Sequence, residues 1–237
     1  MAYPPRYSVG IGPTLTPAVR YLVIASVAVH LLKSLGAGDE MVAFFGLRPY
    51  FVLSKLFIWQ LGTYLFFHGD LIHILVNMFA LWMFGCQLES TWGSRKFLKF
   101  FFVTGIGAGV LSVLFQPFSV IPIIGASGAI YGILMAYGML YPERLVYIYF
   151  LFPVKVKYFV AFLGVVAFLS ALNSPGGTIA HMAHLGGMVF AFLYLKGWLS
   201  LSRVRQDYYR WRIRQMRKRF EVHEGRDRKK EDDYWIH

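Results

Sequence analysis

Charged side chains are scarce in this sequence of 237 residues. Only 15% of the residues are charged, whereas 57% are hydrophobic and 18% are aromatic. A soluble domain usually has about 25% charged residues, so this chain has too few charges to cover a water-soluble fold. The same numbers exclude a disordered or collagen-like chain. The composition therefore predicts a protein that crosses a membrane several times.

Acidic side chains are absent from long parts of the chain. No Asp or Glu lies between Glu89 and Glu143, or between Glu143 and Asp207. This excludes a pair of catalytic aspartates inside the membrane, and it disfavours a proton-coupled carrier, which usually needs membrane carboxylates. The sequence also lacks the HExxH motif of helical zinc proteases and a glycine-rich phosphate loop. Its single cysteine, Cys86, cannot form an internal disulfide.

Six apolar stretches are candidates for membrane-spanning helices, each of which needs about 20 predominantly apolar residues. The fourth and fifth are shorter than this. The first resembles a signal peptide, but no small-residue cleavage site follows it, so a retained span is expected. The predicted fold is an all-α, polytopic membrane bundle of six transmembrane helices. The stretches are 18–35, 71–88, 97–115, 127–140, 158–172 and 179–199.

Basic residues mark alternate loops of the predicted bundle. Arg95, Lys96 and Lys99 follow the second stretch, and the segment after the sixth is rich in arginine. By contrast, residues 116–125 and 173–178 carry no charge. Positive charge marks the cytoplasmic side of a membrane protein. Both termini are therefore expected in the cytoplasm.

The segment 50–67, between the first and second stretches, is apolar and aromatic but contains Lys55 and Gln60. One interpretation is a seventh span. The other is a segment in the membrane interface, where Trp59 and the tyrosines would be well placed. A seventh span would break the alternation of basic and uncharged loops, so the charge pattern favours the interface.

The chain is expected to consist of a membrane-embedded domain, residues 1–202, and a basic cytoplasmic tail, residues 203–237. Residues 202–220 combine basic and aromatic side chains. Such a segment could bind nucleic acid or an acidic partner. Attraction to anionic lipid head groups is the simpler explanation. The lipid bilayer is therefore an expected partner, and nucleic acid is not.

A few polar side chains lie inside the predicted spans, where they are costly and usually face the protein interior. Several are histidines, and a haem or metal bundle with histidine ligands is one interpretation. It would need facing histidines at matched depths, which only the second and sixth stretches could supply. Neither a metal nor a cofactor is therefore expected. The polar side chains are His30, His73, Asn77, Ser127, Tyr131, His181 and His184.

Nucleophilic chemistry at Ser127 is the interpretation that remains. Ser127 begins the fourth stretch, where a backbone N–H has no helical partner and the helix dipole is positive. Gly125 and Gly128 would let the glycine-rich sixth stretch approach closely and bring a histidine to the serine. Tyr131, one turn after Ser127, could pack on the imidazole. Spacing alone does not choose between the two histidines of the sixth stretch.

His73 and Asn77 are four residues apart and share one face of the second stretch. Both can donate hydrogen bonds, so with the N–H of Ser127 they could stabilise an oxyanion. Each motif alone is common in helix packing. Their combination on three alternate stretches indicates a catalytic site.

These motifs together resemble the rhomboid family of intramembrane serine proteases. They are HILVN at 73–77, GASG at 125–128 and AHLGG at 183–187, in this order, and the run ESTWGSR at 89–95 fits as well. The resemblance covers most of residues 15–200. It implies a six-helix core with a water-filled cavity open to the exoplasmic side. It also implies a Ser–His dyad without a carboxylate, in agreement with the missing acids.

The resemblance implies a role for each residue. It chooses His184 over His181 and leaves His181 at most a supporting part. It also implies that the segment 173–179 is a flexible cap over the site. The implied roles are Ser127 as nucleophile, His184 as general base and then acid, His73, Asn77 and the Ser127 amide as oxyanion hole, Tyr131 as a ring stacked on His184, and Gly125 and Gly128 as supporting glycines.

The resemblance further implies transmembrane proteins as substrates, cleaved near the exoplasmic ends of their helices. A bacterial-type enzyme of the inner (plasma) membrane is expected by analogy. The alternative is a proteolytically inactive relative that binds transmembrane clients, although such relatives usually lose the serine or histidine that this chain keeps. The sequence does not indicate an oligomeric state.

Overall fold

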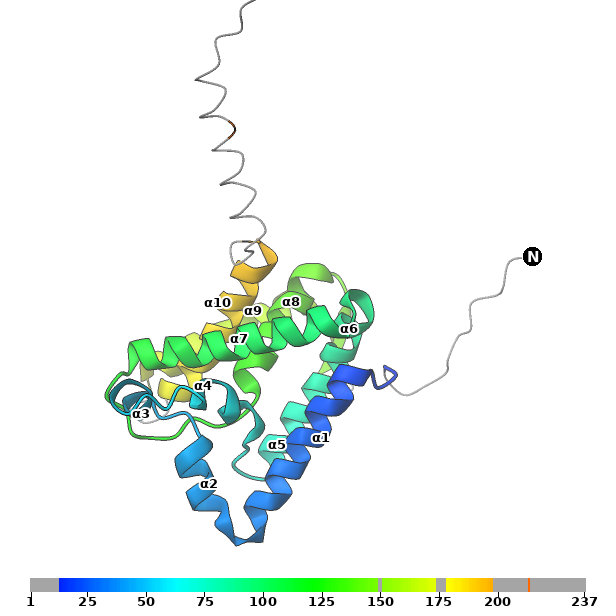
Figure 1. Ribbon diagram of the computed structural model, residues 1–237. Coiled ribbons are helices and arrows are strands. Elements are labelled where there is room, and N and C mark those ends of the chain that lie inside the picture. Colours follow the sequence, from blue (N-terminus) through cyan, green and yellow to red (C-terminus); the bar gives the residue numbers. More distant parts are fainter. Residues whose placement is uncertain (1–12, 149–150, 174–177, 198–212, 214–237) are drawn as a thin grey trace, which may run out of the picture. The chain divides into compact units, whose positions relative to one another are not determined.

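The computed structural model describes residues 13–148, 151–173, 178–197 and 213, and these residues are mostly helical (Figure 1). The chain divides into two compact units, Met1–Lys196 and Gly197–His237. The predicted basic tail lies outside the described residues apart from Ile213. Its boundary at residue 202 stays a prediction.

Helices occupy all six predicted stretches within the described residues. The second contains a π-helical turn, Leu81–Gly85 after α5, and the first ends in a kink within Lys33–Ala37, where Gly36 has a φ of +117°. Pro17–Gly36, Leu71–Trp92 and Ser94–Phe115 are long and apolar enough to cross a membrane, and the other three are shorter. The helices are α1 (Pro17–Leu32), α2 (Gly38–Phe45), α5 (Leu71–Ala80), α6 (Cys86–Trp92), α7 (Ser94–Phe115), α8 (Ser127–Leu140), α9 (Val156–Asn173) and α10 (Thr178–Leu195).

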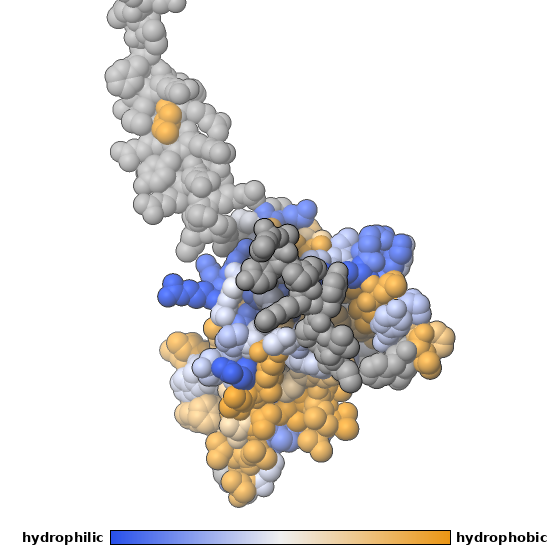
Figure 2. Space-filling model, turned by 90° about the vertical axis from the view of Figure 1, so that its right-hand side faces the viewer, coloured by the Kyte–Doolittle hydropathy of each residue, from blue (hydrophilic) through white to orange (hydrophobic). Residues whose placement is uncertain are grey.

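The outer faces of these helices are apolar. Figure 2 shows a broad hydrophobic surface on one face of the molecule. Leu31 and Leu35 near the end of α1 and Leu75 and Phe79 in α5 are exposed. A soluble protein rarely exposes so much contiguous apolar surface. The surface therefore supports placement in a lipid environment, as the composition predicts.

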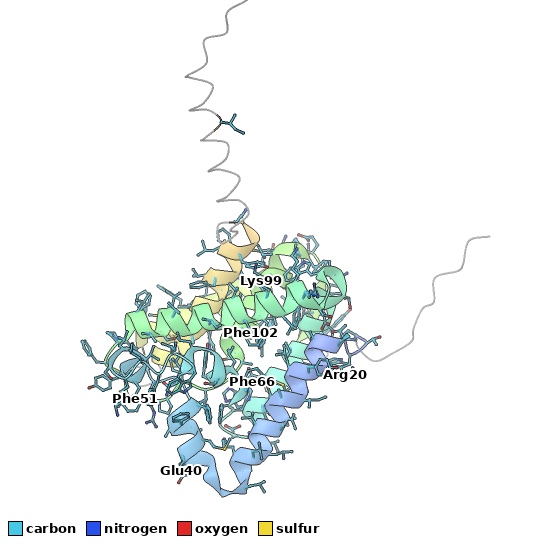
Figure 3. All side chains as sticks on the ribbon, in the orientation of Figure 1. Arg20, Glu40, Phe51, Phe66, Lys99 and Phe102 are labelled. Atoms are coloured by element: carbon cyan, nitrogen blue, oxygen red, sulfur yellow. The ribbon has the colours of Figure 1, made fainter. Side chains whose placement is uncertain are left out.

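The segment 50–67 forms no continuous helix. It consists of the short helices α3 (Pro49–Ser54) and α4 (Gln60–Thr63) and a 3-10 turn, Tyr64–Phe66. Gln60 is buried and bonds the Arg48 amide and the Phe44 carbonyl. A seventh helical span is thereby excluded. Figure 3 labels two of its rings, of which Phe66 lies near Phe102 of α7, with ring centroids 6.4 Å apart.

The fold is mostly helical, as expected, but a short β-hairpin that the sequence analysis did not predict follows α8. Strands β1 (Leu145–Ile148) and β2 (Phe152–Lys155) form an antiparallel hairpin in which Val146 pairs with Val154. β-Branched and aromatic side chains favour strands, and this run is too short to register as a hydrophobic stretch.

Beside the hairpin, hydrogen bonds from Lys155 and Lys157 lower the pKa of Glu143 to about 2.

Glu89 of α6 holds the start of α1. The residue is 2% exposed, and its carboxylate accepts hydrogen bonds from the amides of Ala18, at 2.8 Å, and Val19, at 2.9 Å. It also accepts from the hydroxyls of Ser94, at 2.6 Å, and Thr16. The first amides of a helix lack intrahelical partners and face the positive end of its dipole. One buried carboxylate therefore ties α1, α6 and α7 together.

Glycines allow α10 to pack against α7 and α8 at very short range. A Cβ on Gly187 would lie 1.8 Å from the carbonyl oxygen of Gly128, and a Cβ on Gly186 would lie 2.9 Å from the Cα of Ala108. Only glycine fits where backbones meet in this way. The expected close contact between the fourth and sixth stretches is thus present.

Candidate active site

Ser127 is the first residue of α8, and the loop before it is held by backbone hydrogen bonds to the segment 50–67 (the first-loop segment) and to Leu47 just before it. The amide of Gly125 donates to the carbonyl of Tyr64 at 3.0 Å, and Leu47 and Ile123 exchange backbone hydrogen bonds. Gly125 has a φ of +120°, which strongly favours glycine. This turn delivers the chain into α8 with Ser127 on the side that faces α10.

His184 of α10 lies against Ser127. Its Nε2 is 2.8 Å from the serine Oγ. The ring of Tyr131 stacks on its imidazole with centroids 4.2 Å apart and an interplanar angle of 1°. His181 meets the ring of His184 edge-on at 5.9 Å. The distances therefore place His184, rather than His181, beside the serine.

His73 lies at the start of α5, with its orientation fixed on both sides. Asp70 caps the helix by accepting the amide of His73 at 2.8 Å, and this hydrogen bond lowers the pKa of the Asp70 carboxyl. The amide of Gly69 donates to Nδ1 of His73 at 3.3 Å. An imidazole nitrogen that accepts carries no proton, so the hydrogen of neutral His73 is on Nε2.

Gly125 leaves open a space beside this Nε2. A Cβ on Gly125 would lie 2.8 Å from Nε2 of His73 and 3.8 Å from Oγ of Ser127. Any larger residue at position 125 would thus place its side chain between Nε2–H of His73 and Oγ of Ser127. Gly128 does not line this space; a Cβ there would lie 2.7 Å from the Cβ of Ala108, so it serves helix packing.

Asn77 follows His73 by one turn and is buried. Its Nδ2 donates to the carbonyl of His73 at 2.8 Å. A carboxamide nitrogen has two hydrogens, so one donor remains. Asn77 is therefore placed as the sequence predicts, on the same helix face as His73.

His68 is a component that the sequence analysis missed. It is fully buried, its ring meets that of His73 edge-on at 5.1 Å, and its Nε2 accepts from the amide of Ala126 at 3.5 Å. Burial, and then the nearby His73, lower its pKa to about 4. His68 precedes α5 and belongs to no apolar stretch, so only its short spacing from HILVN could have drawn attention to it.

Stability should depend on pH through His68. The unfolded side chain has a pKa near 6.5 and the folded one near 4, so the unfolded chain binds more protons between these values. The free energy of unfolding should therefore fall as the pH falls through this window. We expect a lower melting temperature at about pH 4.5 than at pH 7, and a smaller difference for His68→Gln. An equal pH dependence in the two proteins would contradict this assignment.

No metal site is evident in the part of the chain that the structure describes. Within it, no three His, Cys, Asp or Glu side chains converge as metal ligands would. His30, one of the histidines considered as a ligand, has a buried Nδ1 without a hydrogen-bond partner among these residues.

The predicted cap, 173–179, has its central residues 174–177 outside the described residues.

The Rhomboid domain family matches residues 56–201. This is more than half of the chain, which therefore belongs to the rhomboid family. The match includes Ser127, Asn77 and the four histidines of the site, His68, His73, His181 and His184. It also includes the first-loop segment from residue 56 onward, which holds the loop before α8.

Three relatives show how far the similarity extends. Rhomboid protein 1, mitochondrial, of Saccharomyces cerevisiae is 34% identical over 161 residues, 64% of this chain and 44% of that protein. Rhomboid protease GluP of Bacillus subtilis is 32% identical over 124 residues, which are 51% of this chain and 24% of that protein. Rhomboid protease GlpG of Salmonella choleraesuis is 33% identical over 128 residues, which are 54% of this chain and 45% of that protein.

The chain thus spans less than half the length of each of these relatives. The rhomboid family includes serine proteases that act within the bilayer, and membership supports a multi-pass membrane protein. One relative is mitochondrial. The comparisons therefore do not single out the bacterial inner membrane that the sequence analysis expected.

Proposed function

We propose that this chain is an intramembrane serine endopeptidase that uses a Ser127–His184 dyad. The observation that carries the proposal is the 2.8 Å contact between Oγ of Ser127 and Nε2 of His184. A nucleophile within hydrogen-bond reach of a base, which is itself oriented by a third group, is the usual signature of covalent catalysis. Here the third group is the stacked ring of Tyr131.

In the proposed reaction, His184 Nε2 takes the proton of Ser127 as Oγ attacks the carbonyl carbon of the scissile peptide. The C–N bond then breaks, and His184 returns the proton to the leaving amine. Water attacks the resulting ester, again with His184 as base, and releases the acid and free Ser127. No carboxylate takes part, in keeping with a sequence that has no acid between Glu143 and Asp207.

The oxyanion would form next to the space at Gly125. We assign its stabilisation to Nε2–H of His73, the free N–H of Asn77 and the amide of Ser127 at the start of α8. The positive end of the α8 dipole points to the same place. Removal of a single oxyanion donor in other enzymes costs about 10²–10³ in rate.

The proposed setting is a bundle of six spans with both termini in the cytoplasm. The uncharged loop before Ser127 then lies on the exoplasmic side, and substrates are transmembrane proteins that unwind locally near that face. Unwinding costs least at glycine and other small or poorly helix-forming residues. Slow turnover is expected because unwinding precedes chemistry.

A fluorophosphonate probe tests the dyad directly. The purified protein in detergent should be labelled, because the probe reacts only with an activated serine. Labelling should vanish in Ser127→Ala and in His184→Ala and persist in His181→Ala. Gel fluorescence with mass spectrometry of the labelled peptide gives both the extent and the site.

Two results would count against the proposal. Labelling that survives His184→Ala but not His181→Ala would move the base by one helical turn. A folded wild-type protein that takes no label and cleaves no transmembrane substrate would favour the inactive, client-binding relative instead.

A methyl group on Gly125 should reduce proteolysis strongly. In Gly125→Ala the new Cβ would press on Nε2 of His73, at 2.8 Å, and the φ of +120° would become strained. We expect kcat/KM to fall roughly 10²-fold or more, as for loss of an oxyanion donor. Gly93→Ala is the control, because Gly93 also has a positive φ, +79°, but nothing within 4 Å. Equal losses in the two variants would show that backbone strain alone is responsible.

A further inference from the structure

Lys33 is placed where an apolar helix ends, and its ammonium group turns back toward the site. It follows α1 directly and begins the segment Lys33–Ala37, in which the chain kinks at Gly36. Its Nζ donates to the carbonyl oxygens of His68 and of Gly69, the latter at 2.6 Å. Two carbonyls from the segment before α5 thus hold a cation from α1, and the two helices lie side by side (Figure 1).

The carbonyl of His68 and the amide of Gly69 belong to the same peptide group. The oxygen accepts from the Lys33 ammonium, while the N–H donates to Nδ1 of His73. A cation on the oxygen draws electron density from the amide, and hydrogen bonds in such a chain strengthen one another. Lys33 therefore makes the Gly69 amide a better donor.

The effect continues through the imidazole of His73. A stronger donor at Nδ1 fixes the tautomer with hydrogen on Nε2 and polarises that N–H. Nε2 borders the space at Gly125, 2.8 Å from the position of a Cβ there, and Oγ of Ser127 lies 3.8 Å from the same position. The charge of Lys33 is thus linked to the reacting centre through one peptide group and one ring.

We propose that Lys33 is a positioning residue for the oxyanion hole. It touches neither the substrate nor the reacting atoms, and it acts by holding His73 as a polarised Nε2–H donor. The proposal rests on the proposed proteolytic function. It gives a role to a half-buried charged side chain that would otherwise be costly to immobilise beside an apolar helix.

The groups around His73 allow this role. His68 lies edge-on to it and stays neutral near pH 7, with its pKa at about 4. Asp70 accepts the backbone amide of His73 and not its ring. Lys33 forms no ion pair with a carboxylate within the described residues. Its hydrogen bonds therefore go to the two carbonyls, while its charge also helps to lower the pKa of the neighbouring Asp70 carboxyl.

Three variants test the proposal on the full chain in detergent micelles. Lys33→Met keeps the length of the side chain and removes the charge, Lys33→Arg restores a cation that can donate to two carbonyls, and Lys55→Met removes an exposed cation from the first loop. On a transmembrane reporter substrate, kcat should fall roughly 10-fold in Lys33→Met with an unchanged KM, an effect smaller than loss of a donor itself. It should recover largely in Lys33→Arg and stay unchanged in Lys55→Met.

Nitrogen-15 NMR of the histidine side chains supplies a readout that does not depend on proteolysis. The Nδ1 resonance of His73, assigned with His73→Gln, should move toward the position of a free acceptor nitrogen in Lys33→Met and return in Lys33→Arg. A loss of kcat without this shift would overturn the proposal. So would a lower melting temperature accompanied by equal losses of activity in Lys33→Met and Lys33→Arg.

Failure of the proposed function would look different. In that case the wild-type protein would neither cleave the reporter nor take up the fluorophosphonate probe, and the catalytic role of Lys33 would fall with it. The NMR comparison would still decide whether Lys33 controls the state of His73.

Discussion

Gly187→Ala is expected to disrupt both the fold and the chemistry. The new Cβ would lie 1.8 Å from the carbonyl oxygen of Gly128, and neither atom belongs to a side chain that can turn away. α8 and α10 would have to separate, although they carry Ser127 and His184. Overpacking of a core typically costs about 1–3 kcal/mol and occasionally more, and backbone against backbone belongs at the upper end. We expect a loss of about 3 kcal/mol or more.

The activity of Gly187→Ala should fall even further than its stability suggests. A displacement of about 1 Å between reacting groups can cost roughly 10²-fold in rate, and the 2.8 Å contact of the dyad depends on the approach of these two helices. Fluorophosphonate labelling and thermal unfolding in the same detergent measure both effects.

Gly164→Ala in α9 is the matched control for this variant. A Cβ there would meet only the flexible end of Met188, at 3.3 Å, and alanine favours a helix over glycine by roughly 1 kcal/mol. Gly164→Ala should therefore be as stable and active as the wild type, or more stable. A Gly187→Ala protein with wild-type labelling and melting would refute the close packing of α8 and α10.

Glu89→Ala should lower stability by about 4 kcal/mol. The substitution leaves four hydrogen-bond donors without their common acceptor, and each buried unsatisfied group costs roughly 1–3 kcal/mol. The hydroxyls of Thr16 and Ser94 can turn elsewhere, but the amides of Ala18 and Val19 cannot. For a chain of this size the melting temperature should fall by about 10 °C. α1 should detach first, which the reactivity of single cysteines introduced along α1 would detect.

Two further variants sharpen this measurement. Glu89→Gln keeps the size of the side chain but turns an amide toward donors, so its loss should be smaller and still clear. Glu40→Gln changes an exposed acid in α2, which Figure 3 labels at the far end of the α1–α2 pair from Arg20, and should have almost no effect. Equal melting temperatures for Glu89→Ala and Glu40→Gln would remove the anchoring role of Glu89.

Hydropathy and charge predict much of this fold because they report directly on the surroundings of each helix. Helices cover the six predicted stretches, and the fourth, 127–140, has the predicted bounds. The first-loop segment lacks a continuous helix, as the alternation of loop charges favoured. The number of spans and the side of the termini stay predictions, because only three helices are long and apolar enough by themselves.

The features that the sequence analysis missed depend on contacts between distant segments. The β1–β2 hairpin is too short for a periodic pattern, and no hydropathy signal marks a π-helical turn. The contact of Lys33 with the peptide His68–Gly69 joins residues 35 positions apart. A lysine at the end of an apolar stretch is more often an interfacial anchor, so its inward orientation could be seen only in three dimensions.

In the candidate site, too, some features could be predicted from the sequence and others could not. Residue types and spacing placed His73 and Asn77 on one face of α5, and Ser127 at the start of a helix. Spacing could not choose between His181 and His184, which are nearly one turn apart; the resemblance chose His184, and the distances place it beside Ser127. The catalytic roles themselves stay predictions that the labelling experiment tests.

The π-helical turn Leu81–Gly85 sets the angular phase between the two ends of the second predicted span. A π-helical turn takes up an additional residue, and each residue of an α-helix advances by about 100°. The face with His73 and Asn77 is therefore rotated relative to Glu89, compared with an unbroken α-helix. Deleting one residue from the turn Leu81–Gly85 would restore a regular α-helix. If the Glu89 carboxylate then stayed in place to cap α1, His73 and Asn77 would turn away from Ser127. The residue count of this helix, and not only its hydropathy, is therefore constrained by both of its ends.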